Sequence, residues 1–207
     1  MKYKWLNKAK NNRIILFFNG WGMDENTVNH LCFDNYDVLM FYNYNNLNTD
    51  FDPNCLGEYK EINLVAWSMG VMVAGIDTLF TSQIKFTHKT AINGTLKPIN
   101  EDFGINPRIY DLTIRGFNEK SCEKFIQNMF TSAQNLINNR NFEEQKNELI
   151  ALKSYKANEN FVYDKIYISQ FDKIIPTKAQ IKFWNTEANL QSGHYPFFNF
   201  RKWSELL

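Results

Sequence analysis

Ser68 lies in the segment Ala66–Gly70 (AWSMG), between an apolar run and a helix-like stretch. A G-x-S-x-G turn between a strand and a helix raises a serine hydroxyl clear of the sheet, where it can act as a nucleophile. The residues two before and two after the serine must be small, because the strand and the helix approach closely there. Ala66 replaces the first glycine of the pattern and Gly70 keeps the second. We therefore predict a nucleophilic serine; the alternative is a serine that only caps the helix.

The segment Asn19–Met23 (NGWGM) follows an earlier apolar run and has glycines on both sides of Trp21. Such glycines would let the backbone aim the Trp21 N–H at a reacting carbonyl, and N–H groups placed in this way form an oxyanion hole. The second N–H would come from Met69, the residue after the serine. An ordinary glycine turn with Trp21 in the core would also explain the segment, but the serine turn downstream favours the oxyanion hole.

A serine nucleophile needs a general base and an acid that orients this base. In the expected chain order the serine comes first, then the acid, then a histidine. His88 and His194 follow Ser68. Because His88 lies within an expected strand, His194, in a turn near the C-terminus, is the candidate base. Asp172 is the candidate acid, because it ends an expected strand, where open α/β sheets place their sites. An ordinary acid at the entry of a helix is the other interpretation of Asp172.

The elements that must position these residues alternate between strands and helices. Apolar runs predict buried strands at 13–18, 37–44, 62–66, 86–92 and 163–171, with helices at 69–80 and 176–185. This alternation indicates an α/β fold with a mostly parallel sheet. About a dozen residues precede the first buried strand, so we expect the N-terminal strands of the sheet to be reduced.

Residues 97–156 break the alternation and predict an all-helical insertion. Its helices are expected at 118–138 and 143–154. One face of the first helix would carry Phe125, Met129, Ala133 and Leu136. We expect a single domain over residues 1–207, in which this insertion forms a helical lid.

Composition excludes several classes of protein. The chain has 23 Lys plus Arg against 22 Asp plus Glu, so the basic excess of a general nucleic-acid binder is missing. With 44% hydrophobic residues, the chain of 207 residues can bury a core and is not disordered. Cys32, Cys55 and Cys122 stand far apart, which suits a reducing compartment, and we expect each to be a small buried side chain. No run approaches the ~18 apolar residues of a membrane span, and no cleavage site follows the basic N-terminus. A cytoplasmic protein without membrane or nucleic-acid partners is expected.

Five segments together carry a resemblance to a known family: NGWGM (19–23), AWSMGV (66–71), AINGT (91–95), FDKIIP (171–176) and SGHYPFF (192–198). In these segments the chain resembles the α/β-hydrolase superfamily. More narrowly, it is similar to the BioG-type pimeloyl-[acyl-carrier protein] methyl ester esterases of bacterial biotin synthesis. The resemblance implies an α/β-hydrolase fold and a serine carboxyl-esterase that hydrolyses this methyl ester to methanol and the free carboxylate.

The same resemblance implies a role for each candidate residue. Ser68 would be the nucleophile, His194 the base and Asp172 its orienting acid, while Trp21 and Met69 would supply the two N–H groups of the oxyanion hole. No metal and no organic cofactor is required for this chemistry.

An acyl carrier protein, which is acidic, is the partner that the resemblance implies. The insertion holds nine basic and eight acidic residues, so its net charge also fits an ordinary solvated surface. Three of the five arginines of the chain lie there, and Arg108, Arg115 and Arg140 are our candidate carrier contacts. We expect the protein to be a monomer.

Two other functions stay open on the sequence. A thioesterase or a general short-acyl ester hydrolase would use the same three side chains, because each reaction proceeds through an acyl-serine. A catalytically silent hydrolase fold that serves only in binding is the second alternative, against which the presence of Ser68, Asp172 and His194 argues.

Overall fold

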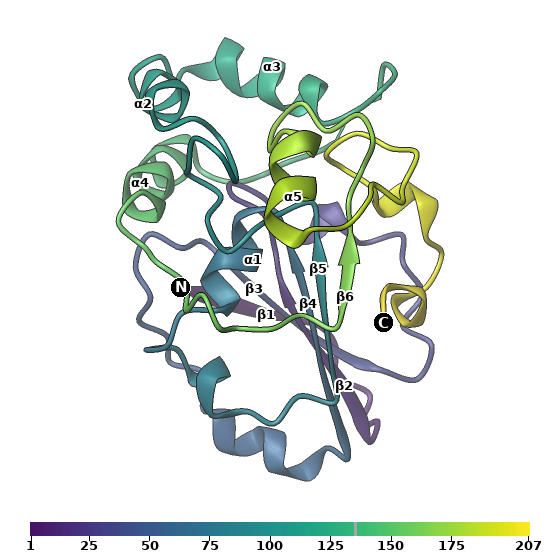
Figure 1. The fold of residues 1–207 in the computed structure, drawn as a ribbon. Coiled ribbons are helices and arrows are strands. Elements are labelled where there is room, and N and C mark those ends of the chain that lie inside the picture. Colours follow the sequence, from purple (N-terminus) through teal and green to yellow (C-terminus); the bar gives the residue numbers. More distant parts are fainter. Residues whose placement is uncertain (135) are drawn as a thin grey trace.

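The computed structural model describes residues 1–134 and 136–207. In these residues a six-stranded sheet has the order β1-β3-β2-β4-β5-β6 (Figure 1). Its strands are β1 (Lys2–Asn7), β2 (Arg13–Phe18), β3 (Asp37–Tyr42), β4 (Glu61–Trp67), β5 (His88–Ile92) and β6 (Lys165–Tyr167). β1 pairs with β3 in the antiparallel sense, and all the other pairings are parallel. The mostly parallel sheet was expected, whereas β1 was not predicted.

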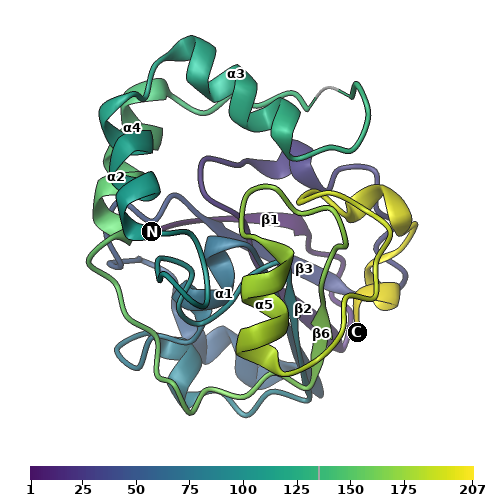
Figure 2. The ribbon, with the colours of Figure 1, turned by 45° about the horizontal axis from the view of Figure 1, so that its top comes forward.

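Five α-helices flank the sheet. They are α1 (Met69–Ala74), α2 (Pro107–Arg115), α3 (Glu119–Asn128), α4 (Phe142–Leu152) and α5 (Thr177–Trp184). α1 and α5 lie on one face of the sheet, while α2, α3 and α4 gather beyond the ends toward which the parallel strands run (Figure 1). Figure 2 shows α2 and α4 side by side, with α3 extending across the top of the molecule. The helical insertion between β5 and β6 therefore lies at the carboxyl end of the sheet.

Two apolar cores lie on opposite faces of the sheet, because successive side chains of a strand point to opposite sides. On β2, Ile14, Leu16 and Phe18 face the core that contains α1. Ile15 and Phe17 face the second core, which residues 195–207 help to close. There Phe17 makes edge contacts with Phe197 and Trp203. The C-terminal segment thus covers a sheet face with 3-10 turns and loops.

Some predicted elements are shorter in the structure. The predicted strand 37–44 ends at Tyr42, because Asn43 adopts a left-handed backbone with φ of 56°. The predicted strand 163–171 is limited to Lys165–Tyr167, and the predicted helix 69–80 ends at Ala74. The strand predicted at 13–18 has the same bounds in the structure.

The predicted helix 118–138 is the largest error in the insertion. α3 ends at Asn128, and the Met129 carbonyl accepts a hydrogen bond from Tyr195 N–H at 3.0 Å instead of continuing a helix. The expected shared face is therefore wrong. Met129 and Leu136 pack in the second core, and Ala133 is exposed. The insertion also begins with an unpredicted helix, α2, which Asn106 caps and Pro107 opens.

Two further observations concern the cysteines and membranes. Cys32 and Cys55 are exposed and Cys122 is half-buried, so the prediction that all three are buried is wrong. Across residues 1–134 and 136–207, the helices are too short or too polar to cross a membrane.

Candidate active site

The two motifs meet where the strand order reverses. β2 and β4 are neighbours, and the chain reaches β3 on one side of β2 and β5 on the far side of β4. Ligands of open α/β sheets bind at such a point, outside the carboxyl ends of the strands. Asn19 directly follows β2 and Ser68 directly follows β4. The topology therefore places the predicted oxyanion segment beside the predicted nucleophile.

The turn at Ser68 has the strained backbone that its motif predicts. Ser68 has a φ of 58° and a ψ of −125°, which L-residues rarely adopt. A Cβ atom on Gly70 would overlap the carbonyl oxygens of Phe18 and Asn19. β2 and α1 thus approach so closely that glycine is required two residues after the serine.

His194 joins the other two candidates. Its Nε2 lies 2.8 Å from Ser68 Oγ, and its Nδ1 lies 2.8 Å from Asp172 Oδ2. A neutral imidazole that donates Nδ1–H to a carboxylate keeps Nε2 free to accept the serine proton. All three residues are buried. The structure brings together the three side chains that the sequence singled out, and their catalytic roles stay a prediction.

Asp172 is fixed by four donors. Its Oδ1 accepts the N–H groups of Ile174 and Ile175 at 2.8 and 3.0 Å. Its Oδ2 accepts Gln180 Nε2 at 2.9 Å in addition to His194. Gln180 is fully buried on α5 and was not predicted. In the sequence, the signal for Gln180 is an amide next to Ala179 on the helix that follows Asp172.

Asn93 holds the histidine segment and was also missed. It lies at the end of β5, is fully buried and has a φ of 45°. Its Nδ2 donates to His194 O at 2.9 Å and to Ser169 Oγ at 2.8 Å, and its Oδ1 accepts Ser169 N–H at 2.8 Å. Trp67 Nε1 donates to the same His194 carbonyl at 3.0 Å. The ends of β4 and β5 thus fix the segment that carries His194.

The backbone after β2 leaves one N–H unused. Among the residues that the structure describes, no acceptor is found for the N–H of Trp21. The neighbouring N–H groups are occupied, by Phe41 O for Asn19, Asn19 Oδ1 for Gly20, Glu148 Oε2 for Gly22 and Gly20 O for Met23. Met69 opens α1, so its N–H has no acceptor within the helix. Both N–H groups are thus available for the predicted oxyanion hole, which stays a prediction.

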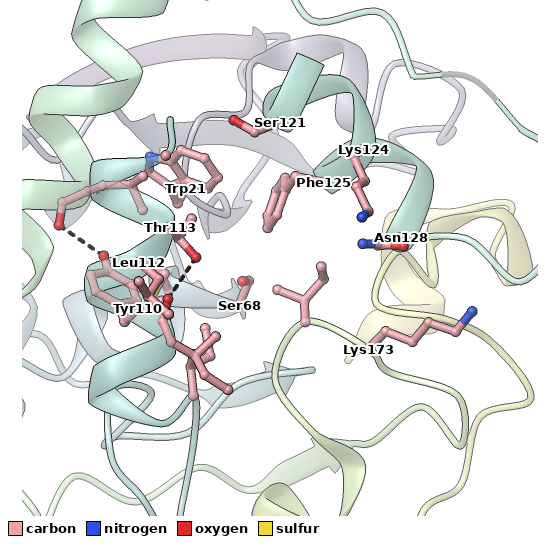
Figure 3. Close-up of a pocket in the computed structure, with 16 residues that line it drawn as sticks. Trp21, Ser68, Tyr110, Leu112, Thr113, Ser121, Lys124, Phe125, Asn128 and Lys173 are labelled. Atoms are coloured by element: carbon pink, nitrogen blue, oxygen red, sulfur yellow. Dashed lines mark hydrogen bonds between the residues drawn. The ribbon is translucent and has the colours of Figure 1, made fainter. Parts of the chain in front are cut away.

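A cavity of about 430 Å³ opens above Ser68. Trp21 and Met69 line it near the serine, and α2 and α3 form its walls (Figure 3). Apolar side chains make up much of its lining, namely Ile105, Ile109, Leu112, Phe125 and Leu149. Lys124, Asn128 and Lys173 lie together on one side of the cavity (Figure 3). The cavity can therefore take an apolar chain with a polar or anionic group near its mouth.

The three arginines predicted to contact a carrier lie in different environments. Arg108 and Arg115 are exposed on α2. The side chain of Arg140 is only 5% exposed, and its Nη2 lies 3.0 Å from Oε2 of fully buried Glu148. Arg140 therefore does not belong to an exposed docking surface, and its prediction is wrong. A count of charges could not show that this guanidinium turns inward.

Glu148 is a fully buried carboxylate that accepts hydrogen bonds from Arg140, Tyr44 and Gly22. Burial raises the pKa of Glu148, while the Arg140 guanidinium and the N–H donors of Tyr44 and Gly22 oppose the rise.

No cluster of three His, Cys, Asp or Glu side chains suited to a metal ion occurs in residues 1–134 and 136–207.

The chain matches the family described as pimeloyl-ACP methyl esterase BioG over residues 1–206. The crystal structure of BioG from Haemophilus influenzae superposes with a TM-score of 0.87 at 34% identity, covering 100% of this chain and 99% of that one. A malonyl-[acyl-carrier protein] O-methyltransferase of Bacteroides fragilis is 36% identical over 184 residues. These are 84% of this chain but 37% of that protein, so the chain spans just over a third of that relative's length.

More distant structures show the fold alone. An esterase from Exiguobacterium antarcticum superposes with a TM-score of 0.68 at 14% identity, covering 95% of this chain and 89% of that one. Together with the Haemophilus structure, this likeness confirms the expected α/β-hydrolase fold.

Proposed function

The chain belongs to the BioG family, whose members are esterases of biotin biosynthesis, and from this premise we propose that it hydrolyses the methyl ester of pimeloyl-[acyl-carrier protein]. The products are methanol and the free carboxylate on the carrier-bound chain. The observation that carries the proposal is the contact of His194 Nε2 with Ser68 Oγ, at 2.8 Å, at the base of the cavity.

The reaction follows from the positions of these atoms. Ser68 Oγ attacks the ester carbonyl while His194 Nε2 takes the hydroxyl proton, and Asp172 stabilises the imidazolium that forms. The N–H groups of Trp21 and Met69 donate to the oxygen that becomes negative. When the tetrahedral intermediate collapses, His194 gives its proton to the methoxy oxygen and methanol leaves. Water, deprotonated by His194, then attacks the acyl-serine and releases the carboxylate and Ser68.

The cavity suits the chain that this ester carries. The apolar side chains of its lining, Ile105, Ile109, Leu112, Phe125 and Leu149, can pack against the methylenes of a pimeloyl group. The carrier is attached at the end of the chain remote from the methyl ester. The acyl chain must therefore run from Ser68 out through the mouth of the cavity.

Cations on the walls of the cavity suit an acidic carrier. Lys124 on α3 and Lys173, directly after Asp172, line the cavity and are exposed, and Arg108 and Arg115 are exposed on α2, which forms one of its walls. None of the four forms an ion pair with a residue that the structure describes. Unpaired charges of one sign steer a partner of the opposite sign to a surface. The carrier interaction, the lid role of the insertion, the single domain over 1–207 and a cytoplasmic monomer are parts of this proposal.

A direct assay and a genetic assay test the function. The wild-type protein should release methanol from pimeloyl-[acyl-carrier protein] methyl ester and leave the carrier thioester intact, while Ser68→Ala should release no methanol. The wild-type gene should also rescue a biotin auxotroph that lacks its pimeloyl-ester esterase. Cleavage of the thioester in preference to the methyl ester would identify a thioesterase. Folded wild-type protein that a fluorophosphonate does not label at Ser68 would favour the binding alternative.

A further inference from the structure

Glu148 is a fully buried charged residue outside the three predicted catalytic side chains. Its Oε2 accepts the Gly22 N–H at 3.3 Å and Arg140 Nη2 at 3.0 Å, and its Oε1 accepts the Tyr44 N–H at 2.9 Å. A buried carboxylate is costly even when it is paired, and a buried ion pair is weak evidence of a role in stability. Its bond to the backbone beside Trp21 points to another role.

The insertion also makes hydrogen bonds to Trp21, Gly22 and Met23 of the loop after β2. Trp21 Nε1 donates to Gln145 O at 2.8 Å, and Asn138 Nδ2 donates to Gly22 O at 2.8 Å. Arg140 Nη1 donates to Met23 O at 3.2 Å. The loop after β2 is therefore bonded residue by residue to the start of α4 and the segment before it, and its shape does not depend on β2 alone.

Gly20 and Gly22 make this loop able to adopt more than one backbone path. Gly22 has a φ of 71°, and glycine accepts both signs of φ at little cost. Rotation of the peptide units around Trp21 could turn either the Trp21 N–H or the Gly22 N–H toward Ser68. In the structure the Gly22 N–H is bound to Glu148, whereas the Trp21 N–H has no acceptor among the described residues and Trp21 lines the cavity.

We infer that Glu148 is a positioning residue, which holds the Gly22 N–H in the interior and so presents the Trp21 N–H to the oxyanion. Glu148 does not contact the substrate and acts only through the loop backbone. The inference rests on the proposed esterase function for its reaction. It adds a residue of the insertion, 126 positions away from Gly22, to the apparatus that stabilises the transition state.

Glu148→Met is the first test. Glutamine would not serve, because its amide oxygen can take the place of Oε2, which faces both Arg140 and the Gly22 N–H, and so leave that N–H its acceptor. Methionine keeps the length of the side chain and removes the acceptor. Because one oxyanion donor contributes about 10²–10³ in kcat, we expect kcat for p-nitrophenyl acetate to fall by about 10–100-fold with little change in KM. Glu144→Met is the matched control, since Glu144 lies one turn earlier on α4, is partly exposed and contacts Lys2, Asn43 and Arg140 Nε instead of the loop. The control should keep wild-type kcat.

A double variant separates positioning from stability. Arg140→Met with Glu148→Met replaces the ion pair by apolar side chains, which is often neutral or stabilising for folding. We expect its melting temperature to exceed that of Glu148→Met, which leaves Arg140 without this partner, while kcat stays low, since the Gly22 N–H still lacks its acceptor. A folded Glu148→Met or double variant with wild-type kcat would overturn the inference.

A measurement on the wild-type chain needs no substitution. Phenylboronic acid becomes tetrahedral when Ser68 Oγ bonds to its boron, and a boronate oxygen then occupies the oxyanion position. In ¹⁵N-labelled protein the Trp21 amide signal should shift strongly on binding and the Gly22 amide signal should not. A shift of Gly22 without Trp21 would refute the inference. Because phenylboronic acid and p-nitrophenyl acetate need no carrier protein, these results stand even if pimeloyl-[acyl-carrier protein] methyl ester is not the substrate.

Discussion

The two halves of the candidate site are fixed by different parts of the molecule. Ser68, Asp172 and His194 are held by the sheet, through the turn after β4, the end of β5 and the loop after β6. The loop with Trp21 is held by the insertion, through Gln145 and Glu148. On the proposed roles, the nucleophile thus depends on strand ends, whereas the Trp21 side of the oxyanion hole depends on a segment inserted between two strands.

The insertion itself divides in the same way. α4 buries Gln145, Glu148, Leu149 and Leu152, while α2 buries Tyr110 and none of the described side chains of α3 is buried. Tyr110 Oη donates to Leu149 O at 2.9 Å, and this hydrogen bond joins α2 to α4. α4 is consequently part of the core and of the loop support. If the insertion acts as a lid, the part free to move is α3 with the adjoining end of α2.

The largest expected effect comes from the centre of the sheet half. Ser68→Ala removes the nucleophile and should lower kcat by about 10⁶-fold, to the residual rate that the oxyanion hole and substrate binding support without it. The fluorophosphonate label should be lost in parallel. Unchanged thermal unfolding would show that the loss is chemical. Substantial residual turnover would contradict the role of Ser68.

Asp172→Asn tests the orienting acid. The amide has one oxygen, which stays with the two backbone N–H groups that Oδ1 accepts, so its NH2 group faces His194 Nδ1 and favours the other imidazole tautomer. We therefore expect kcat to fall by about 10⁴-fold. Asp164→Asn is a control of the same type, since Asp164 Oδ2 binds the Lys89 N–H near the start of β5, far from the serine. Equal losses of kcat in the two variants would place the effect in folding instead of catalysis.

Asn93→Gly tests the support of the sheet half. Glycine tolerates the φ of 45° but removes the bonds to His194 O and to Ser169. We expect kcat to fall by about 10–100-fold, in the range of other loosened catalytic geometries. Asn93→Ala adds backbone strain, so it should melt at a lower temperature than Asn93→Gly. If kcat recovers fully in Asn93→Gly, the side-chain bonds are not needed to place His194.

The smallest expected effect concerns the rim of the insertion half. Lys124→Glu with Lys173→Glu should raise KM for the carrier-bound ester by about 10-fold at low salt and leave KM for p-nitrophenyl acetate unchanged. Lys85→Glu is the control, because Lys85 is exposed near the start of β5, at the other end of the sheet. An equal rise in KM for both substrates would show damage to the cavity instead of loss of carrier binding.

The sequence predicted the sheet half far better than the insertion half. Strands buried on both faces are continuous apolar runs, which can be recognised in a sequence. The close approach of β2 to α1 requires glycine at position 70, and this requirement is also visible in the sequence. Asn93, Gln180 and Glu148 have no comparable signal, since each acts on residues that only the tertiary fold brings near. β1 was missed because it is an edge strand whose two lysines are exposed. Arg140 was misplaced because charge alone does not distinguish a docking residue from a buried partner of Glu148.

The bond between Gly22 and Glu148 has a consequence for how activity is acquired. It joins residues 126 positions apart, the same separation as the bond between Ser68 and His194. Contacts of such long range require closure of large chain loops and form slowly relative to local structure. Both halves of the site are therefore completed late in folding. In a refolding experiment, esterase turnover should return after the far-UV circular dichroism signal, and turnover that precedes it would contradict this order.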